Sequence, residues 1–135
     1  MRDSEAEAQR WLRQAEHDLS FARLALRERY WAQACFVAQQ AAEKALKSLA
    51  YGAGDRLVVG HSLVELVARL SDRFADLATL REQAGILDQY YIATRYPNGL
   101  AGGVPFEAFG EGQAVDAVTA ADRFVGCARA GGSPR

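Results

Sequence analysis

Apolar residues recur at intervals of three and four along most of this chain, and polar residues fill the other faces, which is typical of amphipathic helices. The first such segment runs from about Ser4 to Arg27, and the second from about Trp31 to Tyr51. The second is rich in alanine, which lets neighbouring helices approach closely, and Gly52–Asp55 ends it. Two long helices that share one core are therefore predicted.

Two capping boxes predict where the next helices begin. Ser62 and Glu65 form the first box, which opens a short third helix that stops near Arg73. Thr79 and Glu82 form a second box, so a fourth helix is expected to begin at position 76 or 79. Its apolar positions keep the three-four alternation over almost twenty residues, which predicts one long helix.

Pro97 ends the fourth helix, because it lacks a backbone N–H and moves Tyr96 out of the helical region. The helix should therefore end near Arg95 or Tyr96. The glycine-rich stretch Asn98–Gly112 predicts one long loop, and such loops in compact domains are usually functional or mobile. A last helix is expected from about Gln113 to Arg129.

No segment shows the strict alternation of a β-strand, and the chain has no internal repeat. We therefore expect an all-α fold, an antiparallel four-helix bundle with one short extra helix between the second and the fourth. Residues 1–130 should form a single domain and residues 131–135 a disordered tail. Six residues from all parts of the chain are expected to be buried in one core: Trp11, Leu19, Leu46, Leu66, Leu87 and Val118.

The charge balance restricts the possible partners. The 135 residues include 16 basic and 17 acidic side chains, so the chain is nearly neutral. We therefore do not expect it to coat nucleic acid broadly and independently of sequence. Any nucleic-acid site must be local. No run approaches the roughly 18 apolar residues of a membrane span, and the N-terminal residues have no apolar core. We expect a cytoplasmic protein without membrane contact.

Cysteine and histidine are too sparse to predict a metal site. Cys35 and Cys127 each fall within a predicted helix and are interpreted as reduced packing residues. His17 and His61 lie far apart in the sequence, and neither is close to a cysteine. No glycine-rich phosphate loop is present either. We therefore expect neither a metal nor a cofactor.

The most informative stretch is the end of the fourth helix, where Arg95 is surrounded by Tyr91, Tyr96 and Asn98. A planar guanidinium beside aromatic faces suits the recognition of a phosphate, a nucleobase or a carboxylate. Alternatively, Arg95 only neutralises the negative end of its own helix while the tyrosines fill core and rim. The sequence leaves both interpretations open.

Further polar candidates lie on the second helix and at the start of the third. Gln40, Glu43, Lys44 and Lys47 lie on adjoining parts of one helical face. Glu43 and Lys47 can form an ordinary ion pair, in which case Gln40 and Lys44 are simply exposed to solvent. Alternatively, Lys44 and Lys47 can reach a phosphate. His61 can present a ring nitrogen to a ligand or hydrogen-bond the loop in which it lies.

Four motifs, in this order and spacing, resemble the HEPN domain family: Trp11 with Ala15 and Asp18-Leu19, Gln39–Lys47, His61-Ser62-Leu63, and Tyr91–Pro97. The resemblance covers about Ala6 to Arg129. It implies an all-α bundle that commonly forms a homodimer and is often encoded beside a minimal nucleotidyltransferase as a toxin–antitoxin-like pair. It also implies a role in binding nucleotide or RNA.

Catalytic members of that family cleave RNA without a metal, using an arginine followed after four to six residues by a histidine. Arg95 matches the arginine, but the histidine positions are Leu100, Ala101 and Gly102, and none of these side chains can transfer a proton. The chain thus resembles members that lack the ribonuclease motif. His61 would have to supply the missing imidazole from another helix.

The leading hypothesis is a non-catalytic, dimeric binding module with a site at Arg95, Tyr96 and Asn98 that takes a nucleotide, an RNA phosphate or the nucleotidyltransferase. Further contributors are expected from four side chains: Tyr91, Lys44, Lys47 and His61. A ribonuclease toxin with a rearranged acid–base pair is one alternative. The other is a structural dimeric scaffold in which Arg95 pairs with an acidic residue such as Glu43.

Overall fold

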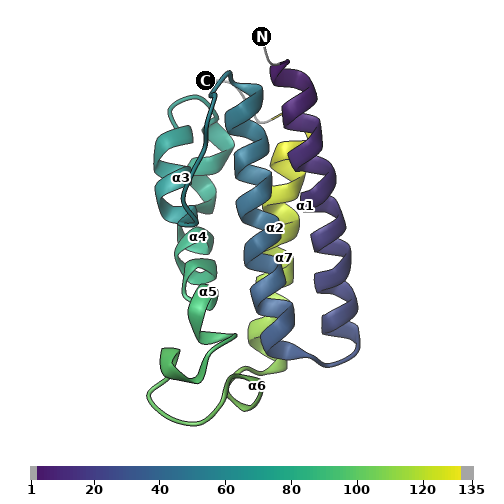
Figure 1. Ribbon diagram of the computed structural model, residues 1–135, viewed down its shortest axis with the longest axis vertical. Helices are drawn as coiled ribbons and strands as arrows, with labels where there is room; N and C mark the ends of the chain where they lie inside the picture. Colours follow the sequence, from purple (N-terminus) through teal and green to yellow (C-terminus); the bar gives the residue numbers. More distant parts are fainter. Residues whose placement is uncertain (1–2, 132–135) are drawn as a thin grey trace.

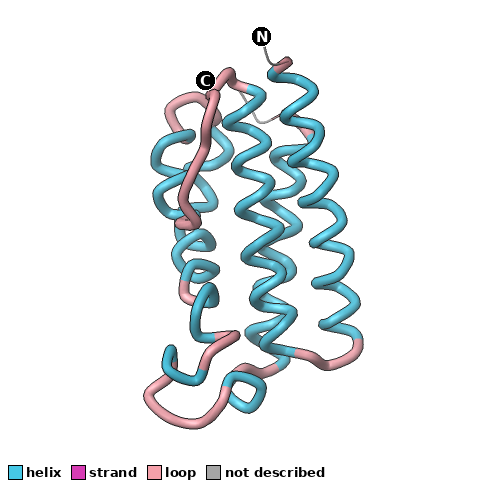
Figure 2. The backbone as a smooth tube through the Cα atoms, in the orientation of Figure 1, coloured by secondary structure: helices cyan, strands magenta, loops and turns pink. Residues whose placement is uncertain are grey.

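The computed structural model describes residues 3–131, and helices dominate this part of the chain (Figure 1). Three long helices, α1 (Ser4–Arg27), α2 (Trp31–Gly52) and α7 (Glu111–Arg129), pack together. The other segments are α3 (Leu63–Leu70), η1 (Ala75–Leu80), α4 (Arg81–Asp88), α5 (Tyr90–Ala93), η2 (Pro97–Gly99) and α6 (Pro105–Ala108). Within residues 3–131 there is no β-strand (Figure 2), so the predicted all-α class is confirmed.

Local signals define both ends of α1. The Asp3 carboxylate accepts hydrogen bonds from the backbone N–H groups of Glu5 and Ala6, which caps the first turn. At the other end Arg29 adopts a left-handed conformation with φ 69°, and the Tyr30 N–H donates to the Ala25 carbonyl at 2.8 Å. This is a Schellman-type ending. It reverses the chain into α2, antiparallel to α1.

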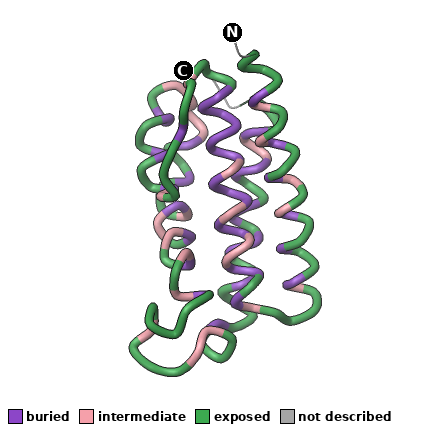
Figure 3. The backbone as a smooth tube through the Cα atoms, viewed as in Figure 1, coloured by how far each residue is buried: buried purple, intermediate pink, exposed green. Residues whose placement is uncertain are grey.

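Helix α2 is the centre of the bundle. Helices α1 and α7 pack against one side of it, and α3, α4 and α5 form a column on the other (Figure 1). Its backbone is therefore buried over most of its length (Figure 3). The small side chains of Ala34, Ala38 and Ala42 have no exposed surface, because helices approach closely on several faces at once.

Five of the six predicted core residues are buried: Leu19, Leu46, Leu66, Leu87 and Val118. Trp11 is only partly buried, so that prediction is wrong in degree. Its ring stacks on Tyr51 at a centroid distance of 5.5 Å, and its Nε1 donates to a carboxylate oxygen of Glu7. The indole thus covers the rim of the core and keeps its N–H paired at the surface.

The prediction of one long fourth helix is wrong. Residues 75–93 instead form η1, α4 and α5 in succession, with a break at Gln89. The second capping box does not form, because the Thr79 hydroxyl donates to the Asp76 carbonyl at 2.7 Å and closes a 3₁₀ turn. The first box does start α3, where the Ser62 hydroxyl accepts from the Glu65 N–H. That helix ends at Leu70, before the predicted Arg73.

The predicted loop is correct in position but contains the helical turns η2 and α6. It is tied to α5 at both ends. Phe109 is buried with its ring edge-on to Tyr90 at 5.7 Å. Near the other end Gly99 lies so close to α5 that a Cβ atom there would be 2.9 Å from the Cα of Ala93. Only glycine fits this approach.

The last helix, α7, begins at Glu111, two residues before the predicted start, and ends at Arg129 as predicted. The predicted tail, residues 131–135, lies outside the described part of the chain apart from Gly131. Over the described residues, no helix combines the length and the apolar character needed to cross a membrane.

Candidate functional site

The chain leaves α5 in a tight turn that fixes Arg95. Helix α5 ends at Ala93, slightly before the predicted terminus, and the backbone N–H groups of Arg95 and Tyr96 both donate to the Ile92 carbonyl at 3.0 and 3.1 Å. Tyr96 is extended, with φ −128° and ψ 130°, as a residue before proline should be. The buried Thr94 hydroxyl donates to the Tyr90 carbonyl. The turn therefore has a defined conformation.

The Arg95 guanidinium is held in place by its own helix end. Its Nε and Nη2 both donate to the Tyr91 carbonyl, at 2.9 and 2.6 Å, which satisfies an acceptor that the helix end leaves unpaired. Of the five N–H donors of an arginine, about three remain available to another group. The residue is exposed, so these donors are accessible to a ligand.

Three aromatic rings surround the same guanidinium. Its central carbon lies 4.3 Å from the ring centroid of Phe36, 4.8 Å from that of Tyr91 and 5.1 Å from that of Tyr96. Each contact is a cation–π interaction, of about 0.5–1 kcal/mol at an exposed site. The rings restrict the rotamers of a long flexible side chain. Arg95 therefore presents its donors in a preorganised way.

Phe36 belongs to this cluster although the sequence analysis missed it. It comes from α2, and its ring centroid is 6.3 Å from that of Tyr91. A signal did exist: Phe36, Gln40, Glu43 and Lys47 follow one another at spacings of four, three and four, which places them on one helical face. The face identified at Gln40–Lys47 thus extends one turn towards the N-terminus of α2.

His61 lies beside this cluster and is oriented by a buried carboxylate. Its Nδ1 lies 3.2 Å from each carboxylate oxygen of Glu43. Its ring stacks on Tyr91 at a centroid distance of 5.0 Å and an angle of 19°. The histidine side chain is 58% exposed, whereas that of Glu43 is 5% exposed. The hydrogen bond to its own loop that the sequence suggested is not made, because the ring nitrogen contacts Glu43 of α2 instead. The ring remains exposed.

The backbone at His61 is fixed by side-chain contacts that the sequence analysis did not predict. The buried Gln39 side chain donates from Nε2 to the His61 carbonyl at 3.2 Å. The next residue, Ser62, donates from its hydroxyl to Asp88 at 3.0 Å. Gln39 lies 22 residues from His61, and Asp88 lies 26 residues from Ser62, so no local pattern could have revealed these contacts.

The two lysines already have carboxylate partners. The Lys47 ammonium lies 3.0 Å from Glu43, and both side chains are buried. The expected i,i+4 pair is therefore present, and it is buried. Lys44 pairs with Asp18 of α1 at 2.5 Å, and its side chain is 25% exposed, so it is partly buried rather than free in solvent. The structure brings Arg95, Tyr91, Tyr96 and His61 together, while the charges of both lysines are neutralised elsewhere.

Two further expectations concern Arg95 and Asn98. The scaffold alternative expected Arg95 to pair with an acid such as Glu43, and this is wrong, because Glu43 binds Lys47 and His61 instead. Across the part of the chain that the structure describes, no carboxylate lies within ion-pair distance of Arg95. Asn98 is exposed in η2, and its side chain makes no hydrogen bond to another described residue.

The cysteines fit their expected role only in part. Both are free thiols. Cys35 has no exposed surface, and burial raises its pKa to about 12, so it is not a thiolate nucleophile near neutral pH. Cys127 is partly exposed, and burial raises its pKa as well. Among residues 3–131, no group of three histidine, cysteine or acidic side chains is arranged to hold a metal ion.

The arrangement can bind an anion next to a flat ring. The Arg95 guanidinium can donate parallel hydrogen bonds to a phosphate or carboxylate, and the 50% exposed Tyr96 can stack its ring on a base. His61 adds a titratable group stacked on Tyr91. Because Nδ1 is directed to Glu43, Nε2 is the nitrogen left for another partner.

Comparison with known proteins gives consistent results. A model of the HEPN domain family matches residues 8–130. The solved structure of TT1696 from Thermus thermophilus is 37% identical, covers 93% of this chain and 98% of its own, and superposes with a TM-score of 0.87. ST0689, an archaeal HEPN homologue, is 35% identical over 92% of this chain and 96% of its own, with a TM-score of 0.76. No protein with a curated description matches significantly.

Proposed function

Because this chain belongs to the HEPN domain family, we propose that it is a non-catalytic module that binds a nucleotide or an RNA phosphate. Arg95 is the anion contact and Tyr96 the surface on which a base stacks. Asn98, Tyr91 and His61 border the same site. Lys44 and Lys47 contribute by shaping the α2 face rather than by direct contact, because their ammonium groups are already paired.

One observation carries this proposal: an exposed arginine without a carboxylate partner among the described residues is held by a carbonyl and three rings. A guanidinium that served only the helix dipole would need none of the rings. Loss of rotamer freedom is part of the cost of binding, so an arginine that is ordered in advance binds an anion more tightly. The nearly neutral chain agrees with a local site rather than a broad basic surface.

The proposal extends to the assembly in which the site works. We propose a cytoplasmic homodimer that acts beside a minimal nucleotidyltransferase in a toxin–antitoxin-like pair. Support for the partner comes from membership of the family alone. In this arrangement the Arg95 site takes either the nucleic-acid ligand or a phosphate-bearing group that the nucleotidyltransferase supplies.

The Glu43–His61 pair favours a second candidate, a metal-independent ribonuclease. Glu43 orients the imidazole through Nδ1, which leaves Nε2 available to transfer a proton. Arg95 would stabilise the phosphate charge. The test is incubation of the purified protein with RNA. Cleavage that disappears in His61→Ala would establish this candidate, and intact RNA would reject it.

The binding module is tested by replacing Arg95 and comparing affinity with stability. Arg95→Ala should cost about 1.5–3 kcal/mol of binding to nucleotide or short RNA, which is at least tenfold in affinity. The melting temperature should change little, because an exposed charge at a helix end contributes only about 0.3–1 kcal/mol. Arg95→Lys should recover part of the affinity, since lysine keeps the charge but loses the planar fork.

Arg27→Ala is the matched control, because Arg27 is also an exposed arginine in the last turn of a helix, α1. It should leave every titration unchanged. Titrations with nucleotide, short RNA and the candidate nucleotidyltransferase are run beside thermal melting. If Arg95→Ala lowers the melting temperature strongly and alters no titration, Arg95 is structural and the proposed site is wrong.

A further inference from the structure

Two neighbouring glutamines of α2 form a short hydrogen-bonded chain beside the candidate site. The Nε2 of Gln40 donates to the Oε1 of Gln39 at 2.7 Å, and the Nε2 of Gln39 donates to the His61 carbonyl at 3.2 Å. Gln39 has no exposed surface, whereas Gln40 is partly exposed. The buried amide therefore connects the backbone before α3 to a side chain that still reaches the surface.

The His61 carbonyl fixes the orientation of both amides. A backbone carbonyl can only accept a hydrogen bond, so Gln39 presents its NH₂ group to it and keeps its oxygen for Gln40. That oxygen can also only accept, so Gln40 presents its own NH₂ group to Gln39. The outer end of the chain is thus a carbonyl oxygen, the Oε1 of Gln40, which has no donor within residues 3–131.

Gln40 lies between the two side chains of α2 that contact the candidate site. Phe36, four residues earlier, has its ring centroid 4.3 Å from the central carbon of Arg95. Glu43, three residues later, has both carboxylate oxygens 3.2 Å from Nδ1 of His61. These offsets correspond to about 6 Å and about 4.5 Å along the helix axis and keep all three side chains on one face. The Gln40 oxygen therefore borders the candidate site.

This oxygen differs from the anion contact in the ligand group that it can bind. The Arg95 guanidinium only donates hydrogen bonds, so it suits the acceptor oxygens of a phosphate. The Oε1 of Gln40 only accepts, so it suits a group that donates. Adenine and cytosine carry such a donor, an exocyclic amine that projects from the edge of the ring. Uracil and hypoxanthine carry a carbonyl at the same position, which would place two acceptors face to face.

We propose that Gln40 selects the base of the bound nucleotide, by accepting a hydrogen bond at Oε1 from the exocyclic amine of adenine or cytosine. Gln39 is a positioning residue, because its bond to Gln40 holds that amide with the oxygen outward. This inference rests on the proposed function, in which Arg95 contacts the phosphate and Tyr96 stacks on the base. It adds the chemical class of the base that the site accepts.

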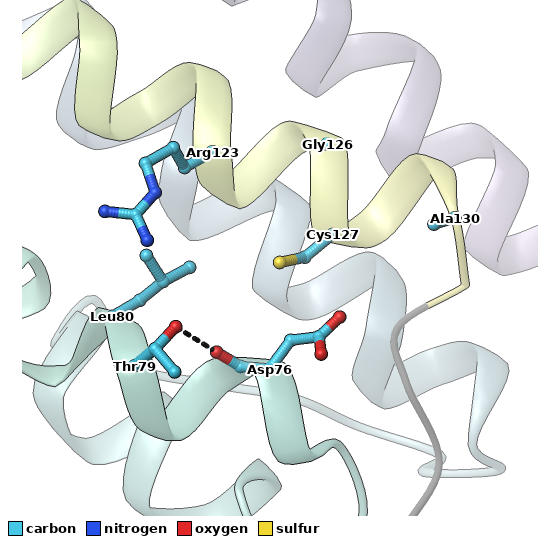
Figure 4. A pocket seen from close by; sticks show the side chains of 7 residues that line it. All are labelled: Asp76, Thr79, Leu80, Arg123, Gly126, Cys127 and Ala130. Atoms are coloured by element: carbon cyan, nitrogen blue, oxygen red, sulfur yellow. Dashed lines mark hydrogen bonds between the residues drawn. The ribbon is translucent and has the colours of Figure 1, made fainter.

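A recess elsewhere in the molecule also contains an arginine but has a different composition. It has a volume of about 390 Å³ and lies between η1 and α7, where the Cys127 thiol points into it beside Asp76 and Arg123 (Figure 4). Arg123 is exposed and has no ion-pair partner in the described part of the chain. Among the described residues that line this recess, none is aromatic. It therefore offers a guanidinium without a surface on which a base can stack.

The test is isothermal titration calorimetry with two pairs of nucleotides that differ at this position of the base, AMP with IMP and CMP with UMP. The parent protein should bind the amine-bearing member of each pair about tenfold more tightly, because the other member leaves the Gln40 oxygen unpaired. Gln40→Met removes the amide at similar length and should abolish this preference. Pyrophosphate, which has no base, should bind the variant and the parent equally through Arg95.

Gln39→Met tests the bond that orients the amide. Without Gln39, the Gln40 amide is free to turn its NH₂ group outward and donate to the carbonyl of IMP. The ratio of the AMP and IMP affinities should therefore fall towards one, whereas a purely structural defect would weaken both nucleotides alike. Gln9→Met, an exposed glutamine on α1, and Arg123→Ala are the controls and should leave every affinity unchanged. Circular dichroism checks that each variant folds.

Short RNAs that contain only adenine or only uracil form a second arm, which distinguishes a base within RNA from a free nucleotide. A preference for the amine-bearing base in either arm supports the inference. A parent protein that binds neither nucleotide nor RNA overturns the proposed function and this inference together, as does loss of binding in Arg123→Ala. If binding depends on Arg95 but AMP and IMP bind equally, or if Gln40→Met keeps the preference, base selection by Gln40 is wrong and the anion site stands.

Discussion

At the scale of single residues, Glu43 joins the core to the candidate site. Its buried carboxylate pairs with the Lys47 ammonium at 3.0 Å and with Nδ1 of His61 at 3.2 Å. Lys47 in turn lies 5.6 Å from the centroid of the Trp11 ring. The charges of Glu43 and Lys47 are thus both removed from water, and each is stabilised by the other.

Glu43→Ala should destabilise the protein by about 3–5 kcal/mol, because it leaves the Lys47 ammonium buried without a counter-charge. The paired replacement of Glu43 by Leu and Lys47 by Met removes both charges and should recover most of the loss. Urea unfolding followed by circular dichroism gives the free energies. Equal destabilisation by the single and the paired variants would show that the two charges do not depend on each other.

Cys35 should make the free energy of unfolding depend on pH in the alkaline range. Burial raises its pKa from 9.0 to about 12, so the folded state keeps the thiol protonated where the unfolded state ionises. The unfolded state then binds fewer protons, and stability falls as the pH rises from about 9 to about 12. The raised pKa of Tyr90, which is also due mainly to burial, acts in the same direction.

Melting temperatures of the parent protein should therefore decline above pH 9, and the decline should be shallower in Cys35→Ala. The variant starts from a lower stability, because it removes a buried sulfur, so the comparison is between slopes rather than absolute values. Cys127→Ala serves as the comparison for a partly exposed thiol. Parallel curves for Cys35→Ala and the parent would exclude Cys35 as the cause.

Sequence reasoning found His61 and the residues of the site that belong to one continuous stretch. Arg95 and its neighbours Tyr91 and Tyr96 were identified because a proline ends their helix. Phe36 was missed, since its contact with Arg95 depends on how α2 and α5 pack. The burial of Lys47 was missed for the same reason: the i,i+4 pair is local, but its surroundings are not.

At the scale of secondary-structure elements, the N-terminus of α3 is capped by another helix. Oδ1 of Asp88, at the end of α4, accepts from the Leu63 N–H at 2.7 Å, and Oδ2 accepts from the Val64 N–H at 3.1 Å. Ser62 donates its hydroxyl to the same carboxylate. A negative group at this end also suits the helix dipole. Asp88 thereby fixes α3 and the adjoining His61.

Asp88→Ala should cost about 1–3 kcal/mol of stability, because two backbone N–H groups of α3 lose their acceptor. Asp88→Asn retains a single acceptor oxygen and should lose less. Thermal melting measures the effect, and Asp72→Ala, an exposed acid in the turn after α3, is the control. If Asp88→Ala melts like the control, water replaces this cap at little cost.

The element boundaries show where local signals are sufficient. The ends of α1 and α2 agree with the predictions because caps, glycines and turn residues act within a few positions. The fourth helix was predicted as continuous because its apolar period is unbroken, but that period is also compatible with η1, α4 and α5 following one another. Periodicity reports which side faces the core, not whether the backbone is continuous.

At the scale of the whole molecule, the class of fold was predictable and the arrangement of its second half was not. The absence of strand alternation and the three-four periodicity sufficed for an all-α bundle. What the sequence could not indicate is that three long helices pack together while α3, α4 and α5 share the remaining side of α2 (Figure 1). This division separates a continuous, alanine-rich core from a segmented column that carries the candidate site.

The division predicts unequal local stability. Amide hydrogen exchange should be slowest in α2, whose backbone is enclosed on nearly all sides. It should be fastest in residues 97–109, because Phe106 is exposed and Phe109 is the only buried residue of this segment. Phe109→Ala removes the ring that packs on Tyr90 and should accelerate exchange in residues 97–109 and in α5 while α1 and α2 remain protected. Mass spectrometry of peptic fragments resolves these segments. If all segments exchanged at one common rate, the molecule would open only as a whole. The division into core and column would then be wrong as a description of its dynamics.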